Sequence, residues 1–293
     1  MLPFRGMSQT ANAVRAEFRA RPPGPFDTIA TTVREVTLRR RLIAYLVRAD
    51  LKKRGANTVL GNIWWILDPL LTMLVYVILV TIIVRSTREA YPLFIFAAIL
   101  PWKWFSSTLN DAVTSIIGRE KIIKQVKFPK IVLPLASVGG GLISFLFGLI
   151  PLSALLILFY STHISPWLLL IPVIAAVQVV FTMGVSILAS GLTVYFRDLG
   201  NVTGHALRIW FYLSPALYGT EQIESLATNH KELFTLYELN PFAGLFESYR
   251  DVIYYGQAPE WNLLVIVLAE SIALLVAAVL VFRRLESSFA KVL

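Results

Sequence analysis

Cysteine is absent from the 293-residue sequence, and histidine occurs three times, at His163, His205 and His230. Without cysteine the chain forms no disulfide bond, performs no thiol chemistry and offers no thiolate to a metal. The three histidines are scattered and show none of the spacings of metal ligands. We therefore expect no metal site in this chain.

The sequence also lacks the short motifs of common catalytic sites. It contains no GxxxxGK[ST] loop, so the chain is not expected to hydrolyse a nucleotide by that route. The HExxH and GxSxG motifs are absent too. The glycine run at residues 139–141 is best explained by close packing between helices, because small residues let membrane helices approach each other. We expect no catalytic residue and no bound cofactor.

Charged residues are scarce. They make up 15% of the chain, against about 25% in soluble domains, while hydrophobic residues make up 56%. The mean hydropathy is +0.67. The net charge of +9 does not form one patch, because the basic residues collect between apolar runs. This distribution is typical of membrane topology and gives no reason to expect a nucleic-acid partner.

Six long apolar runs are predicted to form transmembrane helices, since about 20 residues are needed to cross the hydrocarbon core. They span residues 63–84, 91–117, 131–160, 167–195, 201–218 and 261–282. The fifth is the shortest and carries Arg208, so it is the weakest candidate. The predicted fold is an all-α integral membrane protein whose six-span domain covers residues 59–293. The Pro-rich residues 1–25 show no signal-peptide core and are expected to form a flexible cytoplasmic extension.

Lysine and arginine mark one side of this predicted bundle. Among the 27 basic residues, the loops on the opposite side hold only Arg85, Arg88, Lys231 and Arg250. Because short cytoplasmic loops are enriched in lysine and arginine, both termini are predicted to lie in the cytoplasm.

Residues 26–58 are predicted to form an amphipathic helix. Apolar residues recur at three- and four-residue spacing, and Arg48, Lys52 and Lys53 occupy part of the other face. A basic amphipathic helix next to a span is expected to lie in the membrane interface. The alternative, a helix packed in a soluble domain, is disfavoured by the adjoining apolar run.

The loop at residues 118–130 carries a short basic helix that Phe128-Pro129 ends. Such a helix either docks into a partner or is simply a solvated, positively charged loop, and composition leaves both open. Residues 219–260 form a larger external segment, which is acidic and rich in aromatic residues. We interpret it as two short re-entrant helices, because it is too polar to span and too apolar for a free loop.

Five ionisable residues fall within the predicted spans, where they suggest function by default. Asp68 and Asp111 lie near span ends, and contacts with the interface are favoured for them. Lys103, Arg208 and Glu270 are equally compatible with a structural pair and with a polar channel lining. The full set is Asp68, Lys103, Asp111, Arg208 and Glu270.

Aromatic residues punctuate the predicted spans. Trp64 and Trp65 are best explained as part of an interfacial aromatic belt. The cluster around Pro101 mixes a kink, aromatic rings and a charge, and favours a pore feature. The candidates for a substrate path are Trp64, Asp68, Tyr76, Trp102, Lys103, Trp104, Phe105, Tyr212 and Glu270.

Several short motifs, in their joint order and spacing, resemble the transmembrane subunit of type-2 ABC exporters for lipid-linked polysaccharides such as O-antigen, capsule, teichoic acid and galactan. The resemblance covers residue 36 to the end of the chain. The motifs are LVRADLKKR (46–54), LGNIW (60–64), LPW (100–102), IKQVKFP (123–129), YFRDL (195–199), FYLSP (211–215) and LNPF (239–242).

The resemblance implies a homodimer around a channel in the bacterial cytoplasmic membrane, working with two copies of a separate ATPase that binds ATP and magnesium. It favours a coupling role for the basic loop over a merely solvated one. The coupling residues would be Arg48, Lys52, Lys53, Arg119, Lys121, Lys124, Lys127, Phe128, Arg197 and Asp198. The external gate would include Tyr237, Asn240, Pro241, Phe242 and Tyr249.

Two residues depart from the pattern of this family. Gly55 stands where an aromatic residue is usual, and Asp68 stands where an amide is usual. The function implied is export of an undecaprenyl- or decaprenyl-linked glycan. The alternatives are a type-2 ABC exporter of drugs or small lipids and, less well supported, an ion-coupled transporter or membrane enzyme, which would need an internal repeat or a catalytic cluster.

Overall fold

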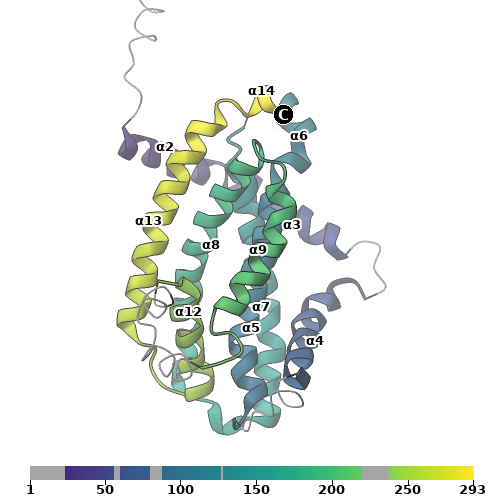
Figure 1. The fold of residues 1–293 in the computed structure, drawn as a ribbon. Helices are drawn as coiled ribbons and strands as arrows, with labels where there is room; N and C mark the ends of the chain where they lie inside the picture. The colour runs from purple at the N-terminus through teal and green to yellow at the C-terminus, as the bar shows by residue number, and fades with distance from the viewer. Residues whose placement is uncertain (1–23, 56–59, 80–87, 127, 220–236, 238) are drawn as a thin grey trace, which may run out of the picture.

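The computed structural model describes residues 24–55, 60–79, 88–126, 128–219, 237 and 239–293 as a helical bundle (Figure 1). Its long helices are α5 (Tyr91–Ser115), α7 (Val132–Phe159), α8 (Ile171–Thr193) and α13 (Trp261–Glu286). No strand occurs in these described ranges. The predicted all-α class is therefore confirmed.

Three of the described helical segments are long and apolar enough to cross a membrane: residues 132–159, 166–193 and 261–286. The first is α7. The second joins the short helix η5 (Pro166–Leu170) to α8, and the third is α13. Helix α4 (Trp64–Ile78) and helix α9 (Leu199–Leu213) have 15 residues each, fewer than the ~20 that a simple span needs. A multi-pass membrane protein is confirmed, and the full set of six spans stays a prediction.

Helix α9 ends earlier than its apolar run. The prediction of a helix to Tyr218 was wrong, because the chain turns into extended backbone at Ser214, with φ −96° and ψ 151°. Pro215 explains this end, since proline disfavours helical backbone in the residue before it.

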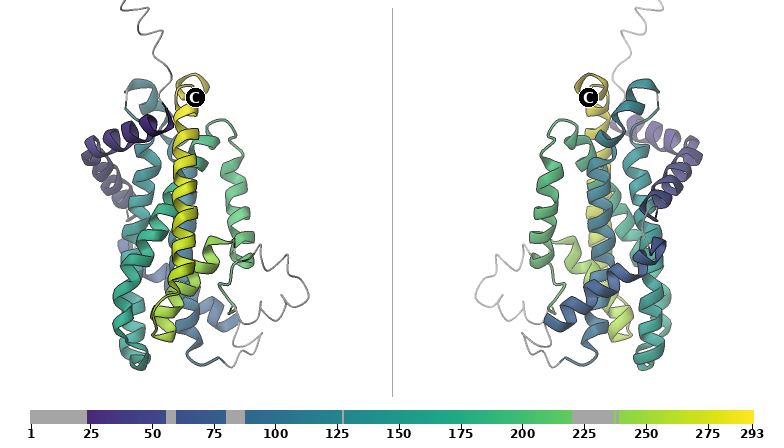
Figure 2. Two further views of the ribbon diagram at one scale, coloured as in Figure 1. Left: turned by 90° about the vertical axis from the view of Figure 1, so that its left-hand side faces the viewer. Right: turned by 90° about the vertical axis from the view of Figure 1, so that its right-hand side faces the viewer.

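The predicted amphipathic helix is observed as two helices, α2 (Pro25–Leu38) and α3 (Arg40–Gly55). They meet at Arg39, whose backbone leaves the helical region at φ −95° and ψ 12°. Both run at an angle to the long helices (Figure 2). Helix α2 packs on α13, and α3 packs on α7.

Glycines of α7 allow this helix to approach both α3 and α5 closely. A Cβ on Gly139 would lie 3.0 Å from Val47 of α3, and a Cβ on Gly141 would lie 1.8 Å from the Thr108 hydroxyl of α5. A Cβ on Gly140 would meet nothing within 4 Å. The predicted packing role is confirmed for the outer two glycines of the run.

Two hydrophobic clusters hold the bundle together. The larger surrounds α5, and the smaller includes Ile116, Ile123, Val132, Phe282 and Phe289. The smaller cluster lies at the end of the bundle that carries α6 (Glu120–Gln125), α14 (Phe289–Val292) and the turn between α8 and α9 (Figure 1). We call this the α6 end.

Near the opposite end, helix α12 (Pro241–Arg250) continues into a π-helical turn, η6 (Asp251–Tyr255). Asn240 caps α12, because its side-chain oxygen accepts a hydrogen bond from the Phe242 amide at 3.1 Å. The second of the two predicted external helices thus has a counterpart in the structure. The first falls in residues 220–236, outside the described residues.

Candidate functional site

Lys103, which lies in the second predicted span, has a carboxylate partner. Lys103 of α5 lies 2.7 Å from an oxygen of Asp68 on α4. The two side chains keep 32% and 57% of their surfaces exposed, so the pair lies at a surface of the chain. The sequence was compatible with Lys103 either forming a structural ion pair or lining a polar channel. In the structure Lys103 forms an ion pair and is also partly exposed, so both roles remain compatible with its position.

A small cavity adjoins this ion pair, between α4, α5 and α7. Its volume is about 110 Å³. Three hydroxyl- or nitrogen-bearing side chains, two apolar residues and a proline share its wall with the pair. The lining residues are Asp68, Pro69, Leu100, Lys103, Trp104, Ser107, Ser144 and Phe145.

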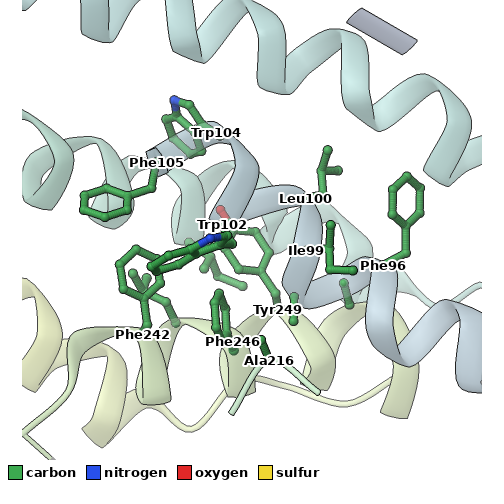
Figure 3. Close-up of a cluster of buried hydrophobic side chains, with 14 of the residues drawn as sticks. Phe96, Ile99, Leu100, Trp102, Trp104, Phe105, Ala216, Phe242, Phe246 and Tyr249 are labelled. Atoms are coloured by element: carbon green, nitrogen blue, oxygen red, sulfur yellow. The ribbon is translucent and has the colours of Figure 1, made fainter. Parts of the chain in front are cut away.

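The aromatic residues beside Lys103 are packed into the core (Figure 3). Trp102 lies against Phe242 of α12, with 4.8 Å between ring centroids. Trp104 stacks on Phe145 of α7 at 4.6 Å, and Phe105 is completely buried. These three rings therefore join α5 to its neighbours, and their assignment to a substrate path remains a prediction.

The remaining path candidates are dispersed. Tyr76 packs on Phe211 of α9, while Trp64 and Tyr212 are exposed. Arg208 on α9 and Glu270 on α13 take part in no ion pair among the described residues. The structure thus brings three of the path candidates, Asp68, Lys103 and Trp104, together at one cavity, and the other candidates are not among its lining residues.

Asn240 ties the start of α12 to the end of α9. Its side-chain oxygen accepts from the Trp210 indole at 3.0 Å, and its side-chain nitrogen donates to the Ser214 hydroxyl at 2.8 Å. Pro241 occupies the first helical turn, and Phe242 and Tyr249 are buried. Tyr237 lies just before this junction. The predicted gate residues that come after it thus belong to one packed element.

Arg250 was missed by sequence reasoning, which counted it with the external charges. Its side chain is 0% exposed, and its guanidinium donates to the Ala216 and Tyr218 carbonyl oxygens at 2.8 and 3.2 Å. The guanidinium carbon also lies 3.7 Å from the centre of the Phe94 ring. No local pattern reveals such a residue, because its partners are distant in the sequence.

At the α6 end, a bidentate ion pair joins α3 to the segment before α6. Arg119 donates from one guanidinium nitrogen to both carboxylate oxygens of Asp50, at 2.6 and 2.7 Å. Arg119 is a predicted coupling residue, and its charge is engaged within the chain. It therefore serves first to fix α6 relative to α3.

Most other predicted coupling residues are exposed on this part of the molecule. Phe128 is partly buried against the smaller hydrophobic cluster, and Lys127 lies outside the described residues. Lys124 pairs with Glu120 at 2.6 Å. The exposed residues are Arg48, Lys52, Lys53, Lys121, Arg197 and Asp198.

The turn between α8 and α9 lies close enough to α6 to influence the pKa of Glu120 on that helix. The hydrogen bond and charge of Lys124 lower the pKa of Glu120, and the charge of Arg197 adds to this effect. Loop and helix thus form one exposed, mostly basic surface. The surface is suited to contact an acidic or polar partner.

A further link fastens α2 to α13. Arg283 donates to the Thr32 hydroxyl at 2.8 Å and pairs with Glu35 on α2 and with Glu286 on its own helix. Both ends of the α2–α3 unit are therefore held to the bundle, one through Arg283 and the other through Asp50.

The comparison with protein families decides the class. The family described as ABC-2 type transporter matches residues 41–254, which is more than half of the chain. The chain belongs to the ABC-2 type transporter family. This ABC-2 transporter chain is thus a membrane subunit, and the matched range runs from α3 to the π-helical turn.

Two groups of relatives extend the match over nearly their full length. An O-antigen export system permease protein RfbA from Myxococcus xanthus is 33% identical over 259 residues, covering 88% of this chain and 98% of that protein. A protein of the same name from Klebsiella pneumoniae is 30% identical over 252 residues, covering 86% and 95%. The ABC-2 transporter chain is therefore similar to these permeases along most of its length.

Proposed function

We propose that this chain is the permease subunit of an ABC transporter that exports an undecaprenyl- or decaprenyl-linked polysaccharide across the bacterial cytoplasmic membrane. The observation that carries the proposal is the full-length similarity to O-antigen export permeases. The sequence has no phosphate-binding loop, so the ATP and magnesium would be held by a separate ATPase subunit.

In the proposed assembly, two copies of this chain, each with six spans, enclose a channel and bind two ATPase subunits. The exposed basic surface at the α6 end is the proposed ATPase contact, with the termini on the same, cytoplasmic side. Because Asp50 and Arg119 join α3 to α6, a push on α6 would move α3 and the start of α4 together.

The far end of the bundle would act as the outer gate. Helix α12 is packed on α5, α8 and α13, so a shift between these helices would also move α12. Such a transition needs two discrete packings of the bundle rather than a continuous deformation. Asn240 is proposed to hold the gate together, since its side chain joins α12 to α9 and would make the two helices move as one unit.

Deletion of the gene tests the proposal directly. Cells without this chain should lose surface polysaccharide and accumulate the lipid-linked glycan in the cytoplasmic leaflet. The measurement is glycan labelling at the cell surface together with extraction of the lipid-linked pool. Normal surface glycan with altered sensitivity to drugs would instead favour the exporter of small molecules.

The split between subunits has its own test. The purified chain should hydrolyse no ATP, and activity should appear only when the ATPase subunit is added. Clear hydrolysis by the chain alone would contradict the division of labour.

The proposed ATPase contact can be tested by charge reversal. Lys121→Glu with Lys124→Glu should weaken co-purification of the ATPase by at least tenfold, because both basic groups lie on α6. Asn262→Glu, on the exposed first turn of α13, adds negative charge away from α6 and serves as the control. Equal co-purification of both variants would exclude α6 as the contact.

A further inference from the structure

In the proposed six-span fold, the Asp68–Lys103 pair would lie at membrane depth. Lys103 is twelve residues from either end of α5, or about 18 Å at 1.5 Å per residue. An ammonium group at such a depth is costly without an anion beside it, which Asp68 supplies. The pair therefore explains how Lys103 stays charged there.

The adjoining cavity places two hydroxyl groups beside the Lys103 ammonium group. The Trp104 ring also lines the cavity, but its indole nitrogen is buried away from open space. The Ser107 and Ser144 hydroxyls donate weakly to carbonyls of their own helices, at 3.3 and 3.2 Å, so both could turn toward a stronger acceptor. Among the lining residues, Asp68 supplies the only negative charge. A wall of this composition is complementary to an anion with several acceptor oxygens.

Asp68 is placed to give way to such an anion. Its side chain is 57% exposed and comes from α4, whereas Lys103, Trp104 and Ser107 all come from α5. A carboxylate on the neighbouring helix can thus leave while the donors stay in place. An incoming anion would keep Lys103 neutralised. The Asp68 carboxylate that it releases is already 57% exposed, so it would turn toward the open surface of the chain.

The size of the cavity limits what enters it. Pockets for drug-sized ligands measure roughly 300–1,000 Å³. This one measures about 110 Å³, which suits a phosphate group and not a chain of sugar rings. The glycan and the lipid tail of a substrate would have to lie outside it.

We propose that Lys103 is the receptor for the phosphate of a lipid-linked substrate, and that Asp68 occupies this receptor while the transporter is empty. The hydroxyls of Ser107 and Ser144 complete the phosphate site. The inference rests on the proposed function, because it assigns a substrate headgroup to the same transport path. It explains why an acidic residue stands at position 68: its charge is the competitor of the substrate phosphate.

Binding of radiolabelled undecaprenyl phosphate to the complex of permease and ATPase tests this. The complex is placed in nanodiscs of neutral phosphatidylcholine. Lys103→Met should weaken binding at least tenfold, since the charge is lost while the side chain keeps its length. Asp68→Asn should tighten binding about threefold or more, because the competing carboxylate is removed. Wild-type affinity in Lys103→Met, or weaker binding in Asp68→Asn, would overturn the proposal.

A charge swap separates a receptor from a purely structural pair. Asp68→Lys with Lys103→Asp restores the ion pair but moves the positive charge to α4, away from the α5 donors. Binding should stay at least tenfold weaker than in the wild type. Full recovery of binding would show that only the ion pair matters. Asp68→Asn with Lys103→Met, which removes both charges, serves as the assembly control in gel filtration.

The source of the phosphate is settled by competition. Phosphatidylglycerol carries a phosphate too, and a tenfold excess should displace less than half of the bound polyprenyl phosphate. Full displacement would reassign the site to bulk phospholipid. Normal surface glycan after gene deletion would refute the export function and leave these binding results standing, so the two failures are distinguishable.

Discussion

Two arginines fasten opposite parts of this molecule in different ways. Arg119, at the α6 end, meets a carboxylate, and the two side chains keep 20% and 30% of their surfaces exposed. Arg250, at the end of α12, is fully buried and meets two backbone carbonyls and an aromatic ring. The first link is close to water, and the second is shielded from it.

This difference indicates which contacts can break and re-form during transport and which should stay intact. A partly exposed ion pair contributes little, because water can replace either partner when it breaks. Buried carbonyls that lose their donor have no such replacement. The α6 end is therefore suited to repeated attachment and release of a partner, whereas the α9–α12 junction should move only as a unit.

The largest expected effect comes from Arg250→Met. The change leaves the Ala216 and Tyr218 carbonyls without a donor, at a cost of roughly 3 kcal/mol in the free energy of unfolding. Thermal unfolding in detergent should show a clear fall in the midpoint. Arg119→Met is the matched comparison and should lower the midpoint less. An equal fall in both variants would show that the two arginines contribute equally to stability.

A smaller loss is expected at the contact of α5 and α7. Gly141→Ala places a Cβ on top of the Thr108 hydroxyl, and overpacking of this kind costs roughly 2 kcal/mol. The control is Gly140→Ala, whose Cβ meets nothing within 4 Å and should be neutral or slightly stabilising. Equal unfolding midpoints for the two variants would mean that α5 and α7 lie farther apart than described.

The Asp50–Arg119 pair should contribute roughly 1 kcal/mol, near the upper end for partly exposed pairs. A double-mutant cycle with Asp50→Asn and Arg119→Met measures this coupling in the free energy of unfolding. The double variant should also bind the ATPase less tightly, because α6 is no longer fixed to α3. A coupling above about 3 kcal/mol would place this link in the same class as Arg250.

The smallest effect concerns Glu120, whose side chain is 37% exposed. Its folded-state pKa lies below 4.5, because Lys124 donates a hydrogen bond to it and holds a positive charge nearby. Its contribution to stability is thus present above about pH 4.5 and is lost as the pH falls through the lowered pKa. Glu120→Gln should leave the unfolding midpoint at pH 7 unchanged within error, and NMR titration of the carboxyl should give the lowered pKa.

Local patterns were enough to predict much of this fold. The apolar runs predicted α7, α8 and α13 closely, because length and hydropathy are properties of the segment itself. The short helix before Phe128-Pro129 was predicted too, and it is observed as α6, which ends at Gln125 because Val126 is already extended. The break at Arg39 between α2 and α3 carries no proline or glycine, so no sequence signal announced it.

The site was harder to predict, because its geometry depends on distant partners. Asp68 and Lys103 were both singled out as intramembrane charges, but nothing in their spacing showed that they pair. Trp104 and Phe105 were assigned to a path from their residue type, and their burial results from packing on α7 and α8. Arg250 was taken for a loop charge, since the carbonyls it binds lie more than 30 residues earlier.

The π-helical turn at residues 251–255 has a consequence for how this segment tolerates change in length. In a π-helix each backbone hydrogen bond joins residues five apart, instead of four apart as in an α-helix. A single π-helical turn therefore contains about one extra residue. Removing one residue there would return the turn to α-helix and rotate the rest of the segment by about 100°. The Tyr254 hydroxyl, which donates to the Glu89 carbonyl at 2.8 Å, would then face another direction. This extra residue sets the phase between α12 and α13, so a deletion here should alter the chain more than any single substitution among the same five positions.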